Sequence, residues 1–322
     1  MRRTIRVLAF IPLLVLAACS SIPRGDSSKV KVTQSAETVR VEIAGKLFTE
    51  YHYKDVVRPY FYPLLGPGDV PMTRKWPLEA STDEEHDHPH HRSLWYAHGE
   101  VNGHNFWSEE GKYGKIVHDG FTGIRSTGKS AEIKSKDKWV ASDGTVICTD
   151  DRLARFSTLH GARIVDFEVT LHASNGDLNF QDTKEGTMAL RLREPMRLKK
   201  PGQGHIVNSE GVKDDATWGK PANWVDYHGP LSGKTMGIAM LDHPENPRHP
   251  TTWHVRDYGL FAANPFGLHD FEKKPAHTGD FKIPAGQSAT FRYRIILHEG
   301  DEKQADIAGQ YSDYVKGLPA NQ

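Results

Sequence analysis

The feature that most constrains the fold of this chain is a two-residue alternation of apolar and polar side chains. In residues 165–172, VDFEVTLH, the two kinds alternate along the whole segment, which is typical of a strand with one buried face. Residues 289–295 and 188–192 alternate in the same way. Turn-forming sequences separate such segments at 142–144, 174–177 and 284–286. Because few segments have a helical period, we predict an all-β chain whose antiparallel strands form a sandwich or a barrel, with a large antiparallel β-sandwich as the expected form.

One short helix is predicted at the C-terminal end. Asp301 is expected to cap this helix, and Gly317 is expected to end it. Five residues between them fall at helical spacing, namely Ile307, Ala308, Tyr311, Tyr314 and Val315.

The first residues have the layout of an export signal. Three arginines precede an apolar run over residues 7–18 that ends in small residues, and this run is too short to span a membrane. Its end, Leu16 to Cys19, resembles a bacterial lipobox, in which Cys19 carries the lipid; an ordinary cleaved signal that contains a cysteine is the alternative. With Ser20 after the cysteine, we expect an exported lipoprotein, anchored by acyl chains at the periplasmic face of the outer membrane or at the cell surface.

The expected domain organisation follows from this start. Residues 1–18 are predicted to be a signal peptide, and residues 19–36, which are polar and serine-rich, a flexible tether. The fold is expected to begin near Val39 and to form a single domain over residues 37–322. Cys148 is the one cysteine after Cys19, so no intramolecular disulfide is expected. The apolar neighbours of Cys148 predict that it is buried.

Charge and motifs argue against several classes of function. The 41 basic residues balance 41 acidic ones, so the net charge does not favour nucleic acid as a partner. The sequence has no GxSxG elbow, P-loop, Rossmann glycine signature or CxxC pair. A serine hydrolase, a nucleotide-binding protein and a thiol redox protein are therefore not expected.

Six histidines lie close together around the sequence DHPHHR. Pro89 prevents a regular helix there and favours an extended conformation at His88. In an extended segment, His88 and His90 would face one side and His91 the other. A divalent metal such as zinc or copper, if one binds, would therefore use His86, His88 and His90, although no cofactor is predicted.

The same segment can instead serve proton transfer. Imidazole titrates near neutrality, so a histidine that faces a cleft beside a carboxylate can act as acid or base. Arg92, next to His91, offers a planar set of donors to an oxygen-rich ligand. Trp95 and Trp107 are candidates either for the core or for stacking on a sugar ring. The remaining alternative for the whole segment is a polar surface loop.

Three further segments carry polar or aromatic residues that could reach a ligand. They are QDTKEGTMALR, WGKPANWVDY and TTWHVRDYGLFAANPFG, and their candidate site residues are Glu185, Arg191, Trp218, Trp224, Asp226, His254, Arg256 and Asn264. Glu185 and Arg191 belong either to one end of the sheet or to a solvated turn. His254 and Arg256 alternate with apolar neighbours and therefore share a strand face. The pairing of histidine with arginine in both HHR and HVR indicates one site assembled from distant strands.

At these motifs the chain resembles a bacterial family of unknown function labelled "methane oxygenase PmoA". The resemblance runs from about residue 50 to residue 315 and comprises six separated motifs, among them RPYFYPLLGPGDVPMTR, DHPHHRSLWYAHGEVNGHNFW, DTKEGTMALR and FRYRIILHEG. The label is not expected to describe the activity. A membrane methane oxygenase subunit is a bundle of transmembrane helices, and no apolar run of spanning length follows residue 18.

In its expected fold, the chain resembles the galactose-mutarotase-like supersandwich, in which curved antiparallel sheets surround a sugar cleft. This resemblance implies that one histidine acts as acid and one glutamate as base on a sugar ring. By role, His91 or His254 would be the acid and Glu185 the base.

The sequence thus predicts an exported lipoprotein that acts on a carbohydrate by His/Glu acid–base chemistry, as a hydrolase, a lyase or an epimerase. Its catalytic residues would be His91, His254 and Glu185. The substrate-binding residues would be His90, Arg92, Arg191, Trp218, Trp224, Asp226, Arg256 and Asn264. A non-catalytic sugar-binding surface lipoprotein and a histidine-ligated metal protein remain as alternatives. The oligomeric state is left open.

Overall fold

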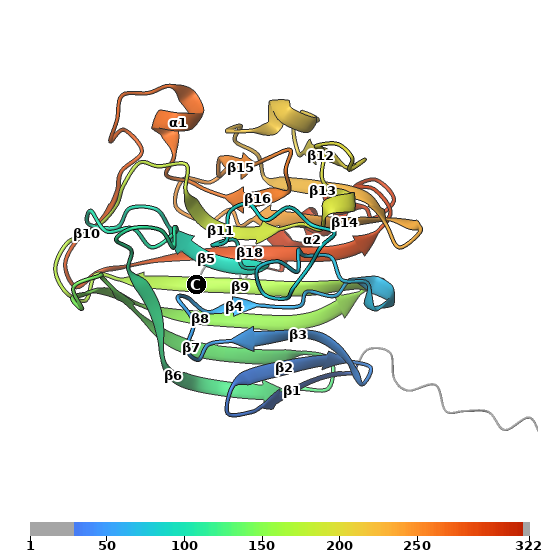
Figure 1. Ribbon diagram of the computed structural model, residues 1–322, viewed down its shortest axis with the longest axis horizontal. Helices are drawn as coiled ribbons and strands as arrows, with labels where there is room; N and C mark the ends of the chain where they lie inside the picture. The colour runs from blue at the N-terminus through green and yellow to red at the C-terminus, as the bar shows by residue number, and fades with distance from the viewer. Residues whose placement is uncertain (1–28, 318–322) are drawn as a thin grey trace, which may run out of the picture.

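Two eight-stranded antiparallel sheets lie face to face in the computed structural model, which describes residues 29–317 (Figure 1). In spatial order, the first sheet consists of β1 (Val30–Gln34), β2 (Thr38–Ile43), β3 (Lys46–His52), β4 (Tyr60–Phe61), β5 (Leu94–His98), β11 (Gly186–Arg191), β16 (Leu260–Ala263) and β15 (Trp253–Val255). The second sheet consists of β12 (His205–Asn208), β13 (Trp224–Leu231), β14 (Lys234–Asp242), β18 (Ser288–Glu299), β9 (Ala162–His172), β8 (Val146–Leu159), β7 (Ala131–Val140) and β6 (Lys115–Ser126).

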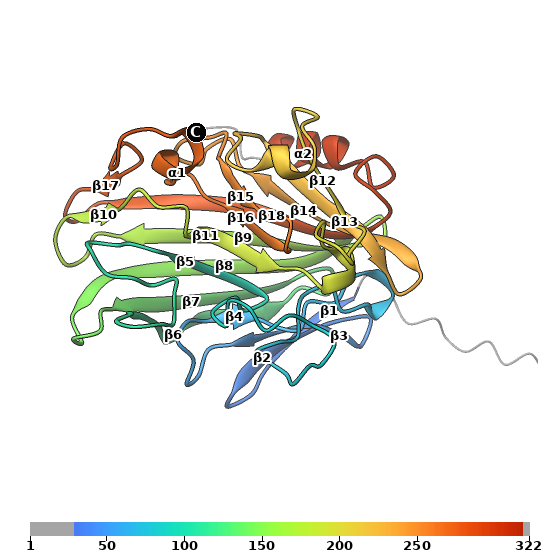
Figure 2. The ribbon, with the colours of Figure 1, turned by 45° about the horizontal axis from the view of Figure 1, so that its top comes forward.

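The remaining elements are short. Strands β10 (Leu178–Phe180) and β17 (Phe281–Ile283) form a two-stranded sheet at one end of the sandwich (Figure 2). The 3₁₀-helices are η1 (Pro67–Asp69), η2 (Glu194–Met196) and η3 (Asp214–Thr217), and the α-helices are α1 (Leu268–Glu272) and α2 (Ile307–Lys316). No helix within residues 29–317 is long and apolar enough to cross a membrane.

The predicted all-β sandwich with a short C-terminal helix is confirmed. The alternating segments of the sequence correspond to β9, β18 and β11. Strands β9 and β18 pair, with Phe167 opposite Tyr293 and Val169 opposite Phe291, and all four side chains are buried between the sheets. The alternation therefore reports a real buried face. Cys148 is a free, buried cysteine, as predicted.

The folded part begins one strand earlier than Val39. Strand β1 lies within the segment that was expected to be a tether, and it pairs with β2, where Val30 lies opposite Ile43 and Val32 opposite Val41. The short apolar alternation of β1 is enough to add a strand to the edge of an existing sheet. The predictions for the signal peptide, for the lipidated Cys19 and for the tether before residue 29 lie outside the described residues.

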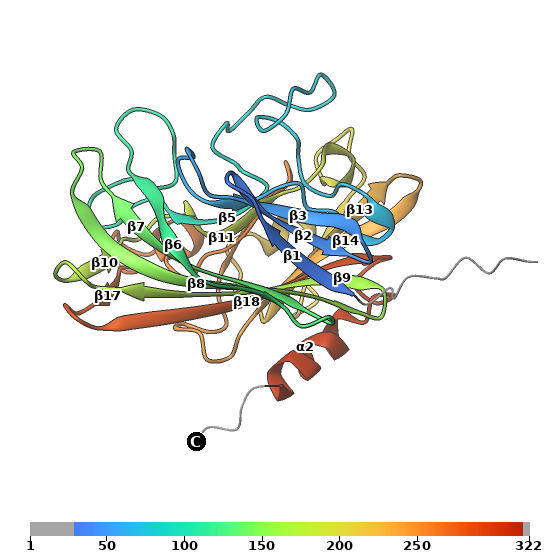
Figure 3. The same ribbon diagram turned by 90° about the horizontal axis from the view of Figure 1, so that it is seen from below.

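Helix α2 ends at Gly317, as predicted, but Asp301 does not cap it. The Asp301 carboxylate instead accepts from the backbone N–H groups of Lys303 and Gln304, in the turn that precedes the helix. Asp306 is the N-cap, because its side chain accepts from the N–H of Gly309. The helix lies against the outer face of the second sheet, below β9 and β18 in Figure 3.

A buried ion-pair network lies on β7 and β8. Asp137 and Asp150 are fully buried, and the Arg152 guanidinium contacts both carboxylates at 2.9 Å. The indole N–H of Trp139 donates to Asp150 at 2.7 Å. Removal of one partner from such a network leaves a buried charge without compensation.

We therefore expect Arg152→Met to lower the free energy of unfolding by roughly 3–5 kcal/mol, because it leaves two buried carboxylates unpaired. The matched control is Arg155→Met on the same strand, whose half-exposed side chain pairs with Glu132 and should cost at most about 1 kcal/mol. Urea denaturation measures both variants. Equal losses in the two variants would contradict the argument.

Candidate functional site

A pocket of about 280 Å³ lies between the loop before β5, the loop after it and the turn that leads into β11. Nine residues line it: His88, His90, Gly99, Glu100, Asn105, Trp107, Ser108, Thr183 and Glu185. The two loops around β5 lie on the side of the first sheet away from the second sheet, opposite α2 (Figure 3). The pocket brings together histidine and glutamate from segments that are distant in the sequence.

The turn that carries Glu185 is fixed through its backbone. The carbonyl oxygen of Lys184 accepts from His254 Nδ1 at 2.7 Å and from Asn264 Nδ2 at 2.8 Å. The N–H of Lys184 donates to the Asp270 carboxylate at 2.9 Å. These bonds come from β15, from the end of β16 and from α1, so three elements position Glu185.

Gly99 allows the chain after β5 to approach Glu185 closely. The N–H of Gly99 donates to the carbonyl oxygen of Glu185 at 2.6 Å. A Cβ atom at position 99 would lie 2.8 Å from the Glu185 Cβ, which is too close for two carbons in contact. Glycine is therefore required here because of packing.

The environment of Glu185 favours its protonated form. Burial raises the pKa of its carboxyl, and the neighbouring Lys184 lowers it by less. Its side chain is still 35% exposed, so a ligand in the pocket can reach it. A carboxyl with a raised pKa that faces a pocket is suited to donate a proton.

His88 has a carboxylate partner. Its Nδ1 lies 2.8 Å from Asp87 Oδ2, and the other oxygen of Asp87 accepts from Arg191 at 2.7 Å and from Arg74. Burial raises the pKa of Asp87, but the hydrogen bond from His88 and the charges of Arg191 and Arg74 outweigh burial and hold this pKa well below its usual range. Asp87 is therefore ionised and accepts the Nδ1 hydrogen of His88, which leaves Nε2 for a ligand.

The histidine segment is a turn and not the extended segment that was expected, but His88 and His90 both line the pocket while His91 lies behind it. His88 has a φ of 46°, and the N–H of His91 donates to its carbonyl oxygen at 3.0 Å. The ring of His88 stacks on His91 at 4.8 Å and on Tyr258 at 5.1 Å between centroids. Pro89 starts a tight turn here rather than an extended strand, so the three rings form one cluster.

His91 lies behind the pocket, not in its lining. It is 2% exposed, and its Nδ1 lies 3.0 Å from Arg191 Nη1. Burial and the charge of Arg191 lower the pKa of His91 well below its usual value. Because arginine can only donate, Nδ1 of His91 carries no hydrogen and the ring is neutral. His91 therefore positions Arg191 and His88.

His90 lines the pocket as a neutral ring. Burial and the charge of Arg58 lower the pKa of His90 to about 3. His254, by contrast, is buried outside the lining, and its pKa is lowered to about 3, chiefly by burial. The expected catalytic role of His254 does not match this place, because its Nδ1 hydrogen is used to hold the carbonyl of Lys184.

Three of the other predicted residues do not line the pocket either. Arg92 is paired with Glu109 through two hydrogen bonds, and this ion pair holds its guanidinium outside the pocket lining. Arg256 lies 5.7 Å over the ring of Trp218, beside His254, whose ring is 6.5 Å from that of Trp218. Arg256 and Trp218 therefore form a separate contact next to the turn that carries Glu185.

Trp224 and Asp226 belong to β13, in the second sheet, which contributes no residue to the pocket. Trp224 is 8% exposed and packs in a small apolar cluster with Leu241 and Ile307. Trp224 and Asp226 therefore do not share the pocket of His90 and Glu185, because their motif continues into the second sheet.

The structure does not bring together His86, His88 and His90, which were the candidate ligands in case a metal binds. His86 stacks on Trp76 at 4.9 Å and its Nε2 lies 2.7 Å from the carbonyl oxygen of Ser81. This arrangement turns His86 away from His88 and His90.

Sequence reasoning missed Asp87, Arg74 and Tyr258 as parts of the site. Asp87 precedes His88 directly, and this adjacency was a usable signal for a carboxylate–imidazole pair. Arg74 is 1% exposed and binds Asp87, the carbonyl of His88 and that of Glu85. No local pattern marks Arg74, because its side-chain hydrogen bonds all go to residues 85–88, more than ten positions away.

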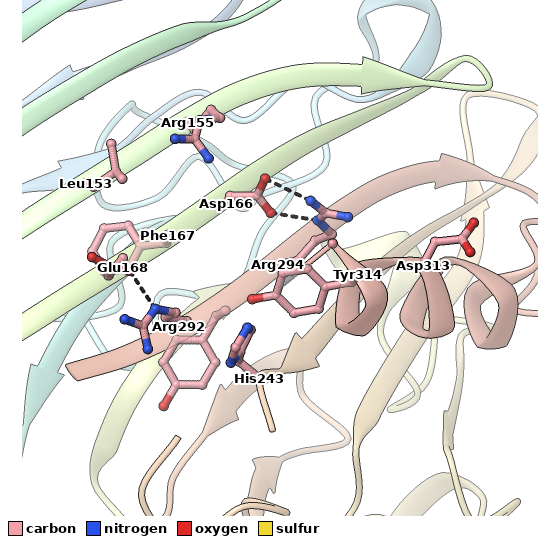
Figure 4. Close-up of a pocket in the computed structure, with 12 residues that line it drawn as sticks. Leu153, Arg155, Asp166, Phe167, Glu168, His243, Arg292, Arg294, Asp313 and Tyr314 are labelled. Atoms are coloured by element: carbon pink, nitrogen blue, oxygen red, sulfur yellow. Dashed lines mark hydrogen bonds and ion pairs between the residues drawn. The ribbon is translucent and has the colours of Figure 1, made fainter. Parts of the chain in front are cut away.

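A second pocket, of about 200 Å³, lies between α2 and the outer face of the second sheet (Figure 4). Its arginines are already paired. Arg292 donates to Glu168 at 2.6 Å and Arg294 donates to Asp166 at 2.6 Å, while the ring of Tyr314 lies 4.5 Å from the Arg294 guanidinium. We therefore regard these contacts as the attachment of α2 to the sheet.

Fold and site thus describe a β-sandwich with a His/Glu pocket on the outer side of one sheet. The chain belongs to a family of unknown function, DUF6807, whose model matches residues 38–312. Membership in the family labelled "methane oxygenase PmoA" stays a prediction. No curated protein sequence matches the chain.

Solved structures with similar folds include several carbohydrate-active enzymes. The galactosidase domain of an alpha-galactosidase–sucrose kinase has a TM-score of 0.41 at 6% identity, over 85% of this chain and 41% of that one. A galactose mutarotase related enzyme from Lactobacillus acidophilus has a TM-score of 0.33 at 8% identity, over 84% of this chain and 97% of that one. A polysaccharide lyase has a TM-score of 0.30 at 11% identity, over 85% of this chain and 33% of that one. At these values, neither substrate nor reaction is transferred to this chain.

The neutral His254 makes stability depend on pH in a defined direction. Its pKa is about 3 in the folded chain and roughly 6.5 in an unfolded one. Its contribution is therefore fully present above about pH 6.5 and is lost as the pH falls towards about 3, at roughly 1.4 kcal/mol per pH unit.

Asn at position 254 keeps a donor for the carbonyl of Lys184 but cannot titrate. When the pH falls from about 7 to about 5, the free energy of unfolding of the wild type should therefore decrease by about 2 kcal/mol more than that of His254→Asn. Urea denaturation at both pH values measures this difference. His86→Asn, at an exposed position, should follow the wild type. If the free energy of unfolding of His254→Asn changes with pH as that of the wild type does, the fold does not require a neutral imidazole at position 254.

Proposed function

We propose that this protein is an enzyme that acts on a carbohydrate by proton transfer between Glu185 and His88. One observation carries the proposal. Glu185 and His88 line the same pocket, and each is fixed from behind by its own set of hydrogen bonds. Two titratable groups in different environments, facing one space, are what acid–base catalysis requires.

The two groups have different roles. Glu185, with its raised pKa, delivers a proton to the leaving oxygen or to the sugar carbon. His88 accepts a proton at Nε2, and the Asp87 carboxylate at Nδ1 stabilises the imidazolium that forms. In this proposal His88 replaces His91 and His254 as the catalytic histidine, and the roles of histidine and glutamate are the reverse of those expected from the resemblance. A hydrolase would use this base on water, and a lyase or an epimerase would use it on a sugar C–H.

The composition of the pocket supports a sugar as the ligand. Trp107, which is 1% exposed, forms the buried aromatic floor of the pocket, and Glu100, Asn105, Ser108 and Thr183 supply donors and acceptors around it. A ring with several hydroxyl groups matches such a mixture of aromatic and polar groups. The export signal and Cys19 support a lipid-anchored enzyme at the outer membrane or the cell surface.

We expect Glu185→Gln and His88→Asn each to lower kcat/KM by at least about 100-fold, because each removes one of the two proton-transfer groups. His86→Asn, two residues from His88 but stacked on Trp76, is the matched control and should keep full activity. Turnover is followed on oligosaccharides by the release of reducing ends and by the absorbance of unsaturated products. Full activity in His88→Asn would remove the proposed base.

The pH profile tests the acid separately. Since Glu185 must be protonated to donate, kcat/KM should fall as the pH rises through its raised pKa, and this decline should disappear in Glu185→Gln. Initial rates from about pH 4 to about pH 9 measure both profiles. If sugar binds without turnover and with one affinity over this range, the protein is a sugar-binding lipoprotein and the enzyme proposal fails.

A further inference from the structure

Asp226 is a fully buried carboxylate on β13, held between two histidines of the second sheet. Its Oδ1 lies 2.6 Å from Nδ1 of His228, and its Oδ2 lies 2.6 Å from Nε2 of His298 on β18. An ionised carboxylate can only accept, so both ring nitrogens donate to it. The pocket of Glu185 and His88 contains none of these residues.

A second carboxylate approaches the same ring. Glu302, in the turn that precedes α2, places Oε2 4.0 Å from Nδ1 of His228. One ligand atom each from Asp226, His228 and Glu302 lie within 4.8 Å of one another. The side chains are 0%, 12% and 17% exposed in this order, so the three donors converge at the edge of the protein interior.

The backbone is shaped to hold this cluster. Gly237 on β14 lies opposite His298 in the sheet, and a Cβ atom at this position would come within 2.2 Å of the His298 ring. Glycine therefore makes room for the ring that fixes the second oxygen of Asp226. On the other side, His205 on β12 brings its ring to 5.9 Å from that of His228.

We infer that Asp226, His228 and Glu302 bind a divalent transition-metal cation, with Zn²⁺ as the best match. One imidazole nitrogen and two carboxylate oxygens are ligands that Zn²⁺ accepts in proteins, with a water molecule as the fourth. The metal takes the place of the hydrogen between His228 Nδ1 and Asp226 Oδ1. His298 donates to the other oxygen of Asp226 and orients it, as partners of metal-bound carboxylates do.

Small shifts complete the geometry. Around a tetrahedral zinc ion, two ligand atoms lie roughly 3.4 Å apart. The separation of Asp226 Oδ1 and His228 Nδ1, 2.6 Å, is shorter than this, and that of His228 Nδ1 and Glu302 Oε2, 4.0 Å, is longer. Both differences are below roughly 1 Å, within the reach of side-chain rotation at the two more exposed residues.

Metal binding at this site joins β13 to the turn that precedes α2. It stabilises the folded chain because the cation connects Glu302 to the sheet. It takes no part in the chemistry of the His88 pocket. The role is structural, and the site shares no residue with His86, His88 and His90, which were the candidate ligands in case a metal binds.

Thermal unfolding and calorimetric titration test the site on the full chain, purified without a histidine tag and stripped with a chelator. Zn²⁺ should bind at one equivalent and raise Tm by a few degrees. His228→Asn and Glu302→Gln should each weaken the Kd by at least about 10-fold. Glu299→Gln is the matched control, because Glu299 is exposed and pairs with Lys234, and it should bind like the wild type.

Co²⁺ in place of Zn²⁺ gives a second measurement that does not depend on stability. Visible absorption bands of protein-bound Co²⁺ should appear in the wild type and in Glu299→Gln and be lost in His228→Asn. An absence of stoichiometric binding of Zn²⁺ and Co²⁺ would overturn the inference, and so would unchanged binding in both His228→Asn and Glu302→Gln. None of these measurements depends on turnover of a sugar, so the result for the metal site is independent of the result for the proposed enzyme.

Discussion

The carboxylate of Asp87 holds the loop before β5 in place, and the site depends on this contact. Arg74 and Arg191 are both 1% exposed, and both bind Asp87. Buried guanidinium groups are costly unless a carboxylate compensates them. The same carboxylate binds Nδ1 of His88. One side chain thus neutralises two buried cations and orients the ring that faces the pocket, so the position of His88 is tied to the stability of the loop.

The fold could be predicted from the sequence because its signal is local. A two-residue alternation needs only a few neighbouring positions, and the strands β9 and β18 show it directly. The site could be predicted only in part. Arg191 and Asp87 are 104 residues apart in the sequence, and the contact of His88 with Tyr258 links the loop before β5 to a turn far along the chain. No pattern within one segment reports such contacts.

The recurrence of histidine beside arginine in HHR and HVR pointed to one site; His254 does bind the turn of Glu185, and His91 packs behind His88. Their role differs from the expected one for a physical reason. A buried histidine next to a guanidinium is held neutral, because burial and the positive charge both disfavour the imidazolium. Such rings are suited to receive or donate one fixed hydrogen bond. Histidine–arginine pairs therefore marked residues that support the pocket, and the pocket histidine with a carboxylate partner is His88, beside Asp87.

The position of α2 has a consequence for how large molecules can approach this protein. The helix covers the outer face of the second sheet, and the loops around the pocket lie on the opposite side of the sandwich (Figure 3). A fusion partner or a solid support joined near the end of α2 would sit behind the molecule. The entrance of the pocket would remain open to solvent, which makes this end the practical choice for attaching the protein when ligands of the pocket are tested.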